Sequence, residues 1–180
     1  MYGIVNKAIQ GLVVENYGEN AWTKIKEKSG VNVESFLSNE SYPDGDTYKL
    51  ATAASEVLNI SLREVLVAFG EYWVLNTGPK NYGSLIQSGG NTLKEFLINL
   101  PNFHSRVMLI FPNLKPPEFF VSEVKERSLL LHYYSTRPGL KDFMYGLIQG
   151  LGKMYKTETK ITILQSREEG FDHEVFFVEW

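Results

Sequence analysis

The run 133–137, Tyr-Tyr-Ser-Thr-Arg, places a phenol, a hydroxyl and a guanidinium at alternate positions. Alternate side chains of an extended segment project from one face, so Tyr133, Ser135 and Arg137 would converge there. Arginine can bind a carboxylate through two parallel hydrogen bonds, and the hydroxyls can bind its remaining lone pairs. The run therefore favours a flat acidic ligand, although a pattern this short more often marks a solvated strand end.

A second candidate group is His104, which lies in a segment with helical periodicity. Apolar residues recur with it at intervals of three or four, so the imidazole should lie on the inner face of a helix. The residues predicted to share this face are Leu97, Leu100, Val107, Met108 and Phe111. An inward histidine is usually a hydrogen-bonded core residue. Together with a carboxylate clamp, however, it also suits a buried haem, which needs an iron ligand and partners for its propionates.

The elements that must position these residues differ along the chain, with helical periodicity in its first part and strand-like patterns in its last part. Residues 1 to about 111 carry helical patterns, and the chain from Glu118 onward becomes strand-like. Ser61 and Glu64 form a capping-box pattern at the start of one helix. A later helix over 140–155 carries Gly146 and Gly150, which permit close packing. Strands are predicted at 119–121, 129–133, 160–164 and 175–178, and His132 should face away from Tyr133. We expect an α+β fold with a helical front and a sheet behind it.

Composition limits the possible functions. The chain has 180 residues, of which 43% are apolar, so we expect one domain over 1–180 with a core large enough to enclose a cofactor. A net charge of −3 gives no reason to expect nucleic acid or a membrane surface as partner. Because cysteine is absent, any haem must be held noncovalently, without a thiolate ligand. No export signal and no bilayer-length apolar run are found, so cytoplasmic residence is expected.

Several short motifs occur in a fixed order along the chain. They are 1–6 (MYGIVN), 15–18 (ENYG), 53–55 (AAS), His104 and 131–140 (LHYYSTRPGL). This ordered set resembles the haem-nitric-oxide/oxygen-binding (H-NOX) domains, including the haem domain of the soluble guanylate cyclase beta subunit, over essentially the whole chain. The resemblance implies a helical N-terminal part packed on a C-terminal four-stranded antiparallel sheet, with haem b buried between them. It also implies that His104 is the iron ligand and that Tyr133, Ser135 and Arg137 bind the propionates.

The same resemblance assigns roles to further residues. Pro117, the second of two prolines, would press on the haem and distort it, although tandem prolines are most often plain connectors. Asp44 matches an acid that could brace Arg137, and it is equally well an ordinary exposed aspartate. The gas pocket would be lined by Ile4, Trp73, Phe143, Met144 and Leu147. Oxygen-binding members place a tyrosine at the position of Phe143, or of Met144 if the alignment shifts by one residue. The Trp73 indole could supply a donor instead, or be plain core.

These observations favour a sensor over an enzyme, because no phosphate-binding loop, zinc-protease motif or nucleophile elbow is present. We expect a haem-based sensor that binds NO and CO, excludes O2 and acts by conformational change on a separate protein. For the resembling family such proteins are histidine kinases, cyclic-di-nucleotide enzymes or chemotaxis receptors. Two alternatives remain open: an oxygen-binding haem sensor or carrier, and a haem-free module for a small acid, which would purify colourless.

Overall fold

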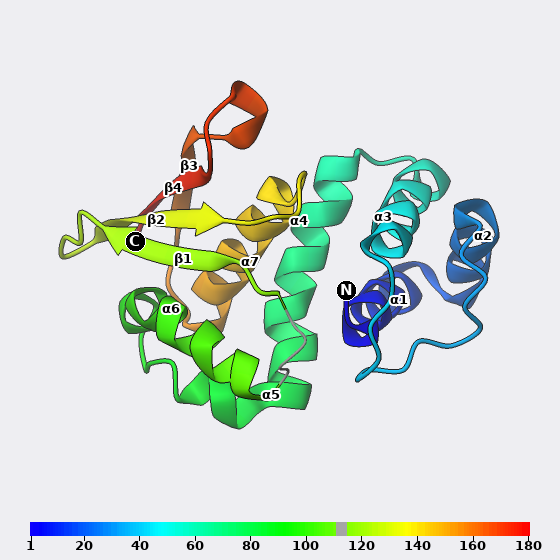
Figure 1. Cartoon of the computed structure of the whole chain (residues 1–180), viewed down its shortest axis with the longest axis horizontal. Coiled ribbons are helices and arrows are strands. Elements are labelled where there is room, and N and C mark those ends of the chain that lie inside the picture. The colour runs from blue at the N-terminus through cyan, green and yellow to red at the C-terminus, as the bar shows by residue number, and fades with distance from the viewer. Residues whose placement is uncertain (111–114) are drawn as a thin grey trace.

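The computed structural model describes residues 1–110 and 115–180, and the predicted helix end at Phe111 lies outside them. Within these residues the N-terminal part is helical and the C-terminal part carries the strands, as predicted (Figure 1). The helical part consists of α1 (Gly3–Tyr17), α2 (Glu19–Ser29), α3 (Asp44–Leu58), α4 (Leu62–Tyr72), the π-helical turn η1 (Trp73–Thr77), α5 (Gly78–Gln87) and α6 (Leu93–Ile110). The remainder comprises β1 (Glu118–Ser122), β2 (Ser128–Tyr134), α7 (Lys141–Met154), β3 (Lys160–Gln165), the short 3-10 turn η2 (Arg167–Glu169) and β4 (Glu174–Glu179).

The four strands form one antiparallel sheet in the order β1-β2-β4-β3. Tyr133 of β2 pairs with Phe119 of β1 and with Glu174 of β4, so these three side chains share a face. His132 pairs with Phe120 and projects to the opposite face, as the alternation predicted. The fold is therefore the predicted α+β arrangement with an antiparallel four-stranded sheet.

Two buried apolar clusters form the core. One is built from α1 to α4 and includes Ile9, Leu50 and Phe69, and the other joins α6 and α7 to the sheet and includes Leu97 and Phe176. Figure 1 shows α1, α2 and α3 on one side of the long helix that begins with α4, and the sheet with α6 and α7 on the other. The long helix therefore lies at the boundary between the two halves.

The long helix begins at a capping box and widens at its middle. The Ser61 hydroxyl accepts a hydrogen bond from the Glu64 amide, and the Glu64 carboxylate accepts one from the Ser61 amide, as the sequence predicted. The π-helical turn starts at Trp73, whose side chain packs against both core clusters. Such single π turns inside α-helices frequently occur at functional sites. None of the helices among the described residues is long and apolar enough to span a membrane.

Helix α7 touches α4 through glycine. A Cβ atom built on Gly146 would lie 2.1 Å from the Val67 carbonyl oxygen, and one on Gly70 would lie 2.2 Å from the Phe143 carbonyl oxygen. The two backbones are therefore in direct contact, and only glycine permits this distance. The predicted close approach of α7 is confirmed, and it fixes Phe143 relative to the helical front.

Candidate cofactor pocket

A cavity of about 290 Å³ lies where the helical front meets the sheet. Its walls come from α1, α3, the long helix, α6, the start of β1, the end of β2 and α7, and most of the side chains are apolar. Every residue that the sequence assigned to the site lines this cavity: Ile4, Trp73, His104, Pro117, Tyr133, Ser135, Arg137, Phe143, Met144 and Leu147. Residues separated by more than a hundred positions thus meet at one place.

His104 presents one defined ring nitrogen to the cavity. Its Nδ1 lies 3.1 Å from the Leu100 carbonyl oxygen, and because a carbonyl can only accept, Nδ1 carries the proton. The ring packs against Phe119, with centroids 4.7 Å apart, and against Phe103. Burial lowers the pKa of His104, so the imidazole is neutral near pH 7 and its Nε2 keeps a lone pair. A neutral imidazole oriented by a backbone carbonyl is a well-prepared metal ligand.

The helix face predicted around His104 is only partly correct. Leu97 and Leu100 are buried and Val107 lines the cavity, but Met108 is 42% exposed and does not line it. A helix advances by 100° per residue, so a residue adjacent to Val107 turns away from the cavity. Met108 therefore cannot compete with His104 as a ligand.

The clamp residues converge, but not by the geometry predicted for them. β2 ends at Tyr134, opposite Glu118 at the start of β1, so Ser135 and Arg137 lie beyond the strand. The chain turns there because the Ser135 hydroxyl accepts a hydrogen bond from the Arg137 amide at 3.1 Å, in place of a partner strand. The strand predicted over 129–133 is present as β2, but the condition of one extended run through Arg137 is not met, and all three side chains nevertheless reach the cavity.

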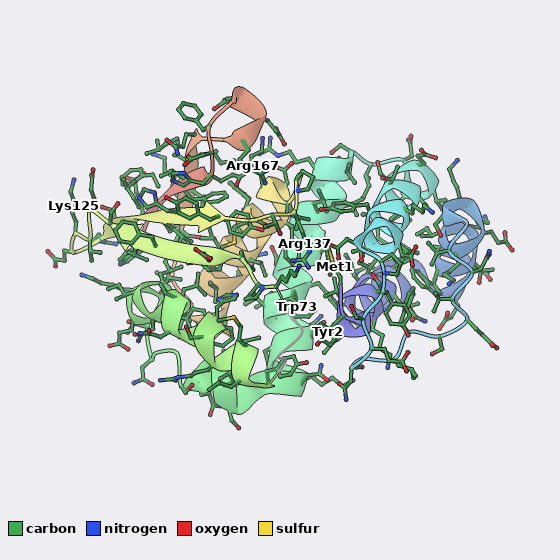
Figure 2. The ribbon with its side chains drawn as sticks, viewed as in Figure 1. Met1, Tyr2, Trp73, Lys125, Arg137 and Arg167 are labelled. Carbon is green, nitrogen blue, oxygen red and sulfur yellow. The ribbon has the colours of Figure 1, made fainter. Side chains whose placement is uncertain are left out.

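Arg137 is held in place from two sides. Its Nε donates to Asp44 Oδ2 at 2.7 Å, and its NH1 donates to the Lys115 carbonyl at 2.7 Å. The other Asp44 oxygen accepts from the Met1 ammonium group at 2.5 Å, and Figure 2 shows Met1 and Arg137 next to each other. Burial raises the pKa of Asp44, but the hydrogen bonds and charges of Met1 and Arg137 outweigh it, so the pKa lies below its usual value. The suggested brace between Asp44 and Arg137 exists.

The wall formed by the predicted gas-pocket residues is apolar. Ile4 and Met144 are buried, and Phe143 is half-buried and packs on Phe69 with ring centroids 4.7 Å apart. Phe143 and Met144 both line the cavity, so the one-residue shift in alignment does not change the apolar character of this wall.

Several polar side chains that line the cavity were not predicted from the sequence. Thr47 and Tyr48 reach it from α3, and Tyr82 reaches it from α5. Tyr48 donates a hydrogen bond to the Pro138 carbonyl at 2.8 Å, so its phenol is engaged next to the clamp. Burial raises the pKa of Tyr82, which keeps its phenol protonated. Tyr82 interrupts the helical geometry of α5, with φ −138° and ψ 27°, and no periodic pattern could have placed it here.

The donor set fits a haem. A largely apolar cavity suits the macrocycle, one oriented imidazole suits the iron, and an arginine with two hydroxyls nearby suits the propionates. Arg137 uses two of its N–H groups on Asp44 and Lys115, and a guanidinium has five. The described residues therefore leave it N–H groups that can donate to a propionate.

Comparison with known proteins decides the family. The family model described as Haem-NO-binding matches residues 2–163. The chain belongs to this family. It is 31% identical over 176 residues to soluble guanylate cyclase gcy-32 of Caenorhabditis elegans, covering 96% of this chain and 26% of that protein. It is 25% identical over 170 residues to soluble guanylate cyclase 89Da of Drosophila melanogaster, covering 94% and 26%. The chain thus spans about a quarter of the length of these curated relatives.

Solved structures confirm the H-NOX fold. An H-NOX protein from S. oneidensis in the Fe(II)NO ligation state matches with a TM-score of 0.90 and 19% identity, covering 99% of this chain and 98% of that one. The Fe(II) unliganded H-NOX protein from K. algicida matches with a TM-score of 0.86 and 22% identity, covering 99% and 96%. The chain is therefore an H-NOX domain, a member of a family of haem-binding gas sensor domains.

Proposed function

We propose that residues 1–180 act as a single cytoplasmic sensor unit that binds haem b noncovalently and responds to NO and CO. The observation that carries the proposal is His104, a neutral imidazole that a backbone carbonyl orients toward an apolar cavity next to Arg137. The family membership supports it independently. A bound haem would supply the iron at which a diatomic gas binds, and His104 Nε2 would be its protein ligand.

The clamp has the task of orienting the cofactor. Arg137 would fork onto a propionate while Tyr133 and Ser135 bind the remaining lone pairs. Burial raises the pKa of Tyr133, so its phenol stays protonated and can donate. The hydrogen bond that Arg137 Nε donates to Asp44 would keep the guanidinium in position beside the cofactor.

The apolar wall has the task of discriminating between gases. Dioxygen at such a site gains from a buried hydrogen-bond donor more than NO or CO does, and Phe143, Met144 and Leu147 donate none. We therefore propose exclusion of O2 under air. Two side chains that line the cavity carry a donor that would contradict this, namely the phenol of Tyr82 and the indole of Trp73.

The output would be conformational, and no catalytic step is assigned to this domain. Pro117 lines the cavity beside the clamp, so a stiff ring in contact with the macrocycle would transmit its displacement through close-packed neighbours. Arg137 joins the sheet side to Asp44 and Met1 of the helical front. A gas-induced shift would thus move the two halves relative to each other and be read by a separate effector, such as a histidine kinase, a cyclic-di-nucleotide enzyme or a chemotaxis receptor.

An absorption spectrum of freshly purified protein tests the proposal directly. We expect a coloured protein whose reduced spectrum changes on addition of NO or CO and which forms no stable oxy complex in air. A protein that purifies colourless and does not take up added haem would contradict the cofactor assignment. A stable oxy spectrum in air would contradict the exclusion of O2, and its loss in Tyr82→Phe would identify the donor responsible.

A further inference from the structure

Four polar side chains form a continuous hydrogen-bonded chain on the outer face of the sheet, away from the haem cavity. The Ser122 hydroxyl lies 2.8 Å from His132 Nε2, and His132 Nδ1 lies 3.0 Å from His173 Nε2. His173 Nδ1 in turn lies 2.5 Å from Asp172 Oδ1. This series of hydrogen bonds runs from β1 through β2 to the turn between β3 and β4, and none of the four side chains lines the cavity.

The Asp172 carboxylate at one end of the series determines which ring nitrogens of the two histidines are protonated. A carboxylate can only accept, and Asp172 Oδ1 lies 2.5 Å from His173 Nδ1, so Asp172 accepts from His173 Nδ1–H. His173 Nε2 then has a lone pair and accepts from His132 Nδ1–H. His132 Nε2 consequently accepts from the Ser122 hydroxyl. A single proton therefore lies between His132 Nδ1 and His173 Nε2. The other nitrogen of each ring is hydrogen-bonded to an oxygen, of Ser122 for His132 and of Asp172 for His173.

We propose that His132 Nδ1 and His173 Nε2 form a binding site for a divalent transition-metal cation of the imidazole-preferring class, with Cu²⁺ as the best fit. With metal–nitrogen bonds of about 2.0 Å, two neighbouring nitrogens lie about 2.8 Å apart on a square-planar cation and about 3.3 Å apart on a tetrahedral one. The observed separation of 3.0 Å falls between these values. The cation lies to one side of the line that joins the two nitrogens, so both rings turn to direct a lone pair at it, and the shared proton moves from His132 Nδ1 to Nε2 of the same ring.

The surroundings of both rings match those of metal-ligating histidines. Such histidines almost always donate their other N–H to a carboxylate, a carbonyl or water. Here Asp172 accepts from His173, and the Ser122 hydroxyl is placed to accept from His132 Nε2–H. The Tyr134 ring stacks on His173 with centroids 4.0 Å apart, which holds the imidazole in one orientation. The supporting shell of the site is thus present before any cation binds.

The protein offers few ligands to a cation at this site, so the cation should be held loosely. The side-chain amide of Gln165 lies 3.3 Å from His173 Nε2, and its oxygen can serve as a third ligand after an amide flip. The described residues contain no group of three or more His, Cys, Asp or Glu side chains that could hold a metal. With two imidazoles, one amide and water, the cation should exchange with solvent and contribute little to folding.

The charges around the two rings favour a cation. Asp172 is exposed at the rim, and the charge of Glu123 also acts on His132, so both carboxylates favour a cation. The sheet contributes no lysine or arginine to the hydrogen-bonded chain itself.

The test is titration of the protein, purified without a histidine tag, with Cu²⁺ alone in a non-coordinating buffer. We expect one Cu²⁺ per chain by calorimetry and a paramagnetic resonance signal split by two imidazole nitrogens. His132→Asn and His173→Asn should each weaken binding by more than about 100-fold, and Asp172→Asn, which keeps both ligands, by about tenfold. Glu169→Gln, an exposed carboxylate on the same turn, is the matched control and should bind as the parent does.

Three outcomes would overturn the proposal: no binding, binding that survives in both histidine variants, or a signal split by one nitrogen only, which indicates His104 or adventitious copper. Circular dichroism of each variant separates lost binding from lost folding, and Asp172→Asn covers the case in which a histidine variant fails to fold. Because the readout is copper and not haem, failure here leaves the proposed sensor function untouched.

Discussion

Replacing Arg137 with alanine tests whether the guanidinium holds the cofactor. Asp44 and Lys115 accept from its Nε and NH1 groups at 2.7 Å each, and the guanidinium has further N–H groups that can donate to a propionate. A charge-assisted hydrogen bond contributes about 1.5–3 kcal/mol, equivalent to about 10- to 150-fold in retention. A neutral hydroxyl contributes about 0.5–1.5 kcal/mol, so Tyr133→Phe should cost only about 2- to 12-fold.

The assay is the rate of haem transfer to excess apomyoglobin. Arg137→Ala also removes the ion pair with Asp44, and Asp44→Asn removes the charge of that pair while retaining Arg137 itself. Because Asp44 is 39% exposed, the pair should contribute no more than about 1 kcal/mol. We therefore expect haem loss in the order Arg137→Ala, then Tyr133→Phe or Asp44→Asn, then the parent. Urea unfolding of the haem-free proteins measures any general loss of stability.

Two results would refute this reasoning. If Arg137→Ala retained haem as well as the parent, the guanidinium would have no role in binding it. If Asp44→Asn lost haem as fast as Arg137→Ala, the contact between the two halves of the domain, and not a bond to the propionate, would explain the effect of Arg137.

Further predictions concern the iron ligand, the gas pocket, the contact between α4 and α7, and stability at acidic pH. His104→Gly should lose the parent's ferrous spectrum and recover a similar one with added imidazole, and an unchanged spectrum without imidazole would exclude His104 as ligand. Phe143→Tyr should gain measurable O2 affinity of about ten- to a hundredfold from one buried donor, checked by titration under air. Gly146→Ala should lower stability by about 1–3 kcal/mol in thermal unfolding, whereas Gly83→Ala, with open space at its Cβ position, should not. The pKa of Asp44 is lower in the folded protein than in the unfolded chain, so the contribution of Asp44 to the free energy of unfolding is present above the unfolded pKa. That contribution is lost as the pH falls through the folded pKa. In Asp44→Asn the free energy of unfolding should therefore fall less steeply as the solution is acidified.

The sequence predicted the elements well because each carries its own local signal. The capping box at Ser61 and the alternation around Tyr133 depend on neighbours along the chain, and both are confirmed. The strand predicted over 129–133 ends within one residue of the end of β2, but the turn that follows was not predicted because the hydrogen bond from the Arg137 amide to the Ser135 hydroxyl leaves no mark in the alternation. Tyr82 was missed for a similar reason, since the kink in α5 that accompanies its position in the cavity wall has no periodic signature.

The position of the cavity explains why one cofactor could communicate with the whole domain. The helical front and the sheet side have separate apolar clusters, so few side chains other than Trp73 pack against both. Between the clusters, Arg137 on the sheet side reaches Asp44 of α3, and Asp44 reaches Met1 before α1. A propionate that displaces Arg137 would therefore act on the starts of α1 and α3 at once. Close-packed clusters move as bodies and not by gradual deformation, so a small displacement at the clamp should appear as a rotation of one half against the other.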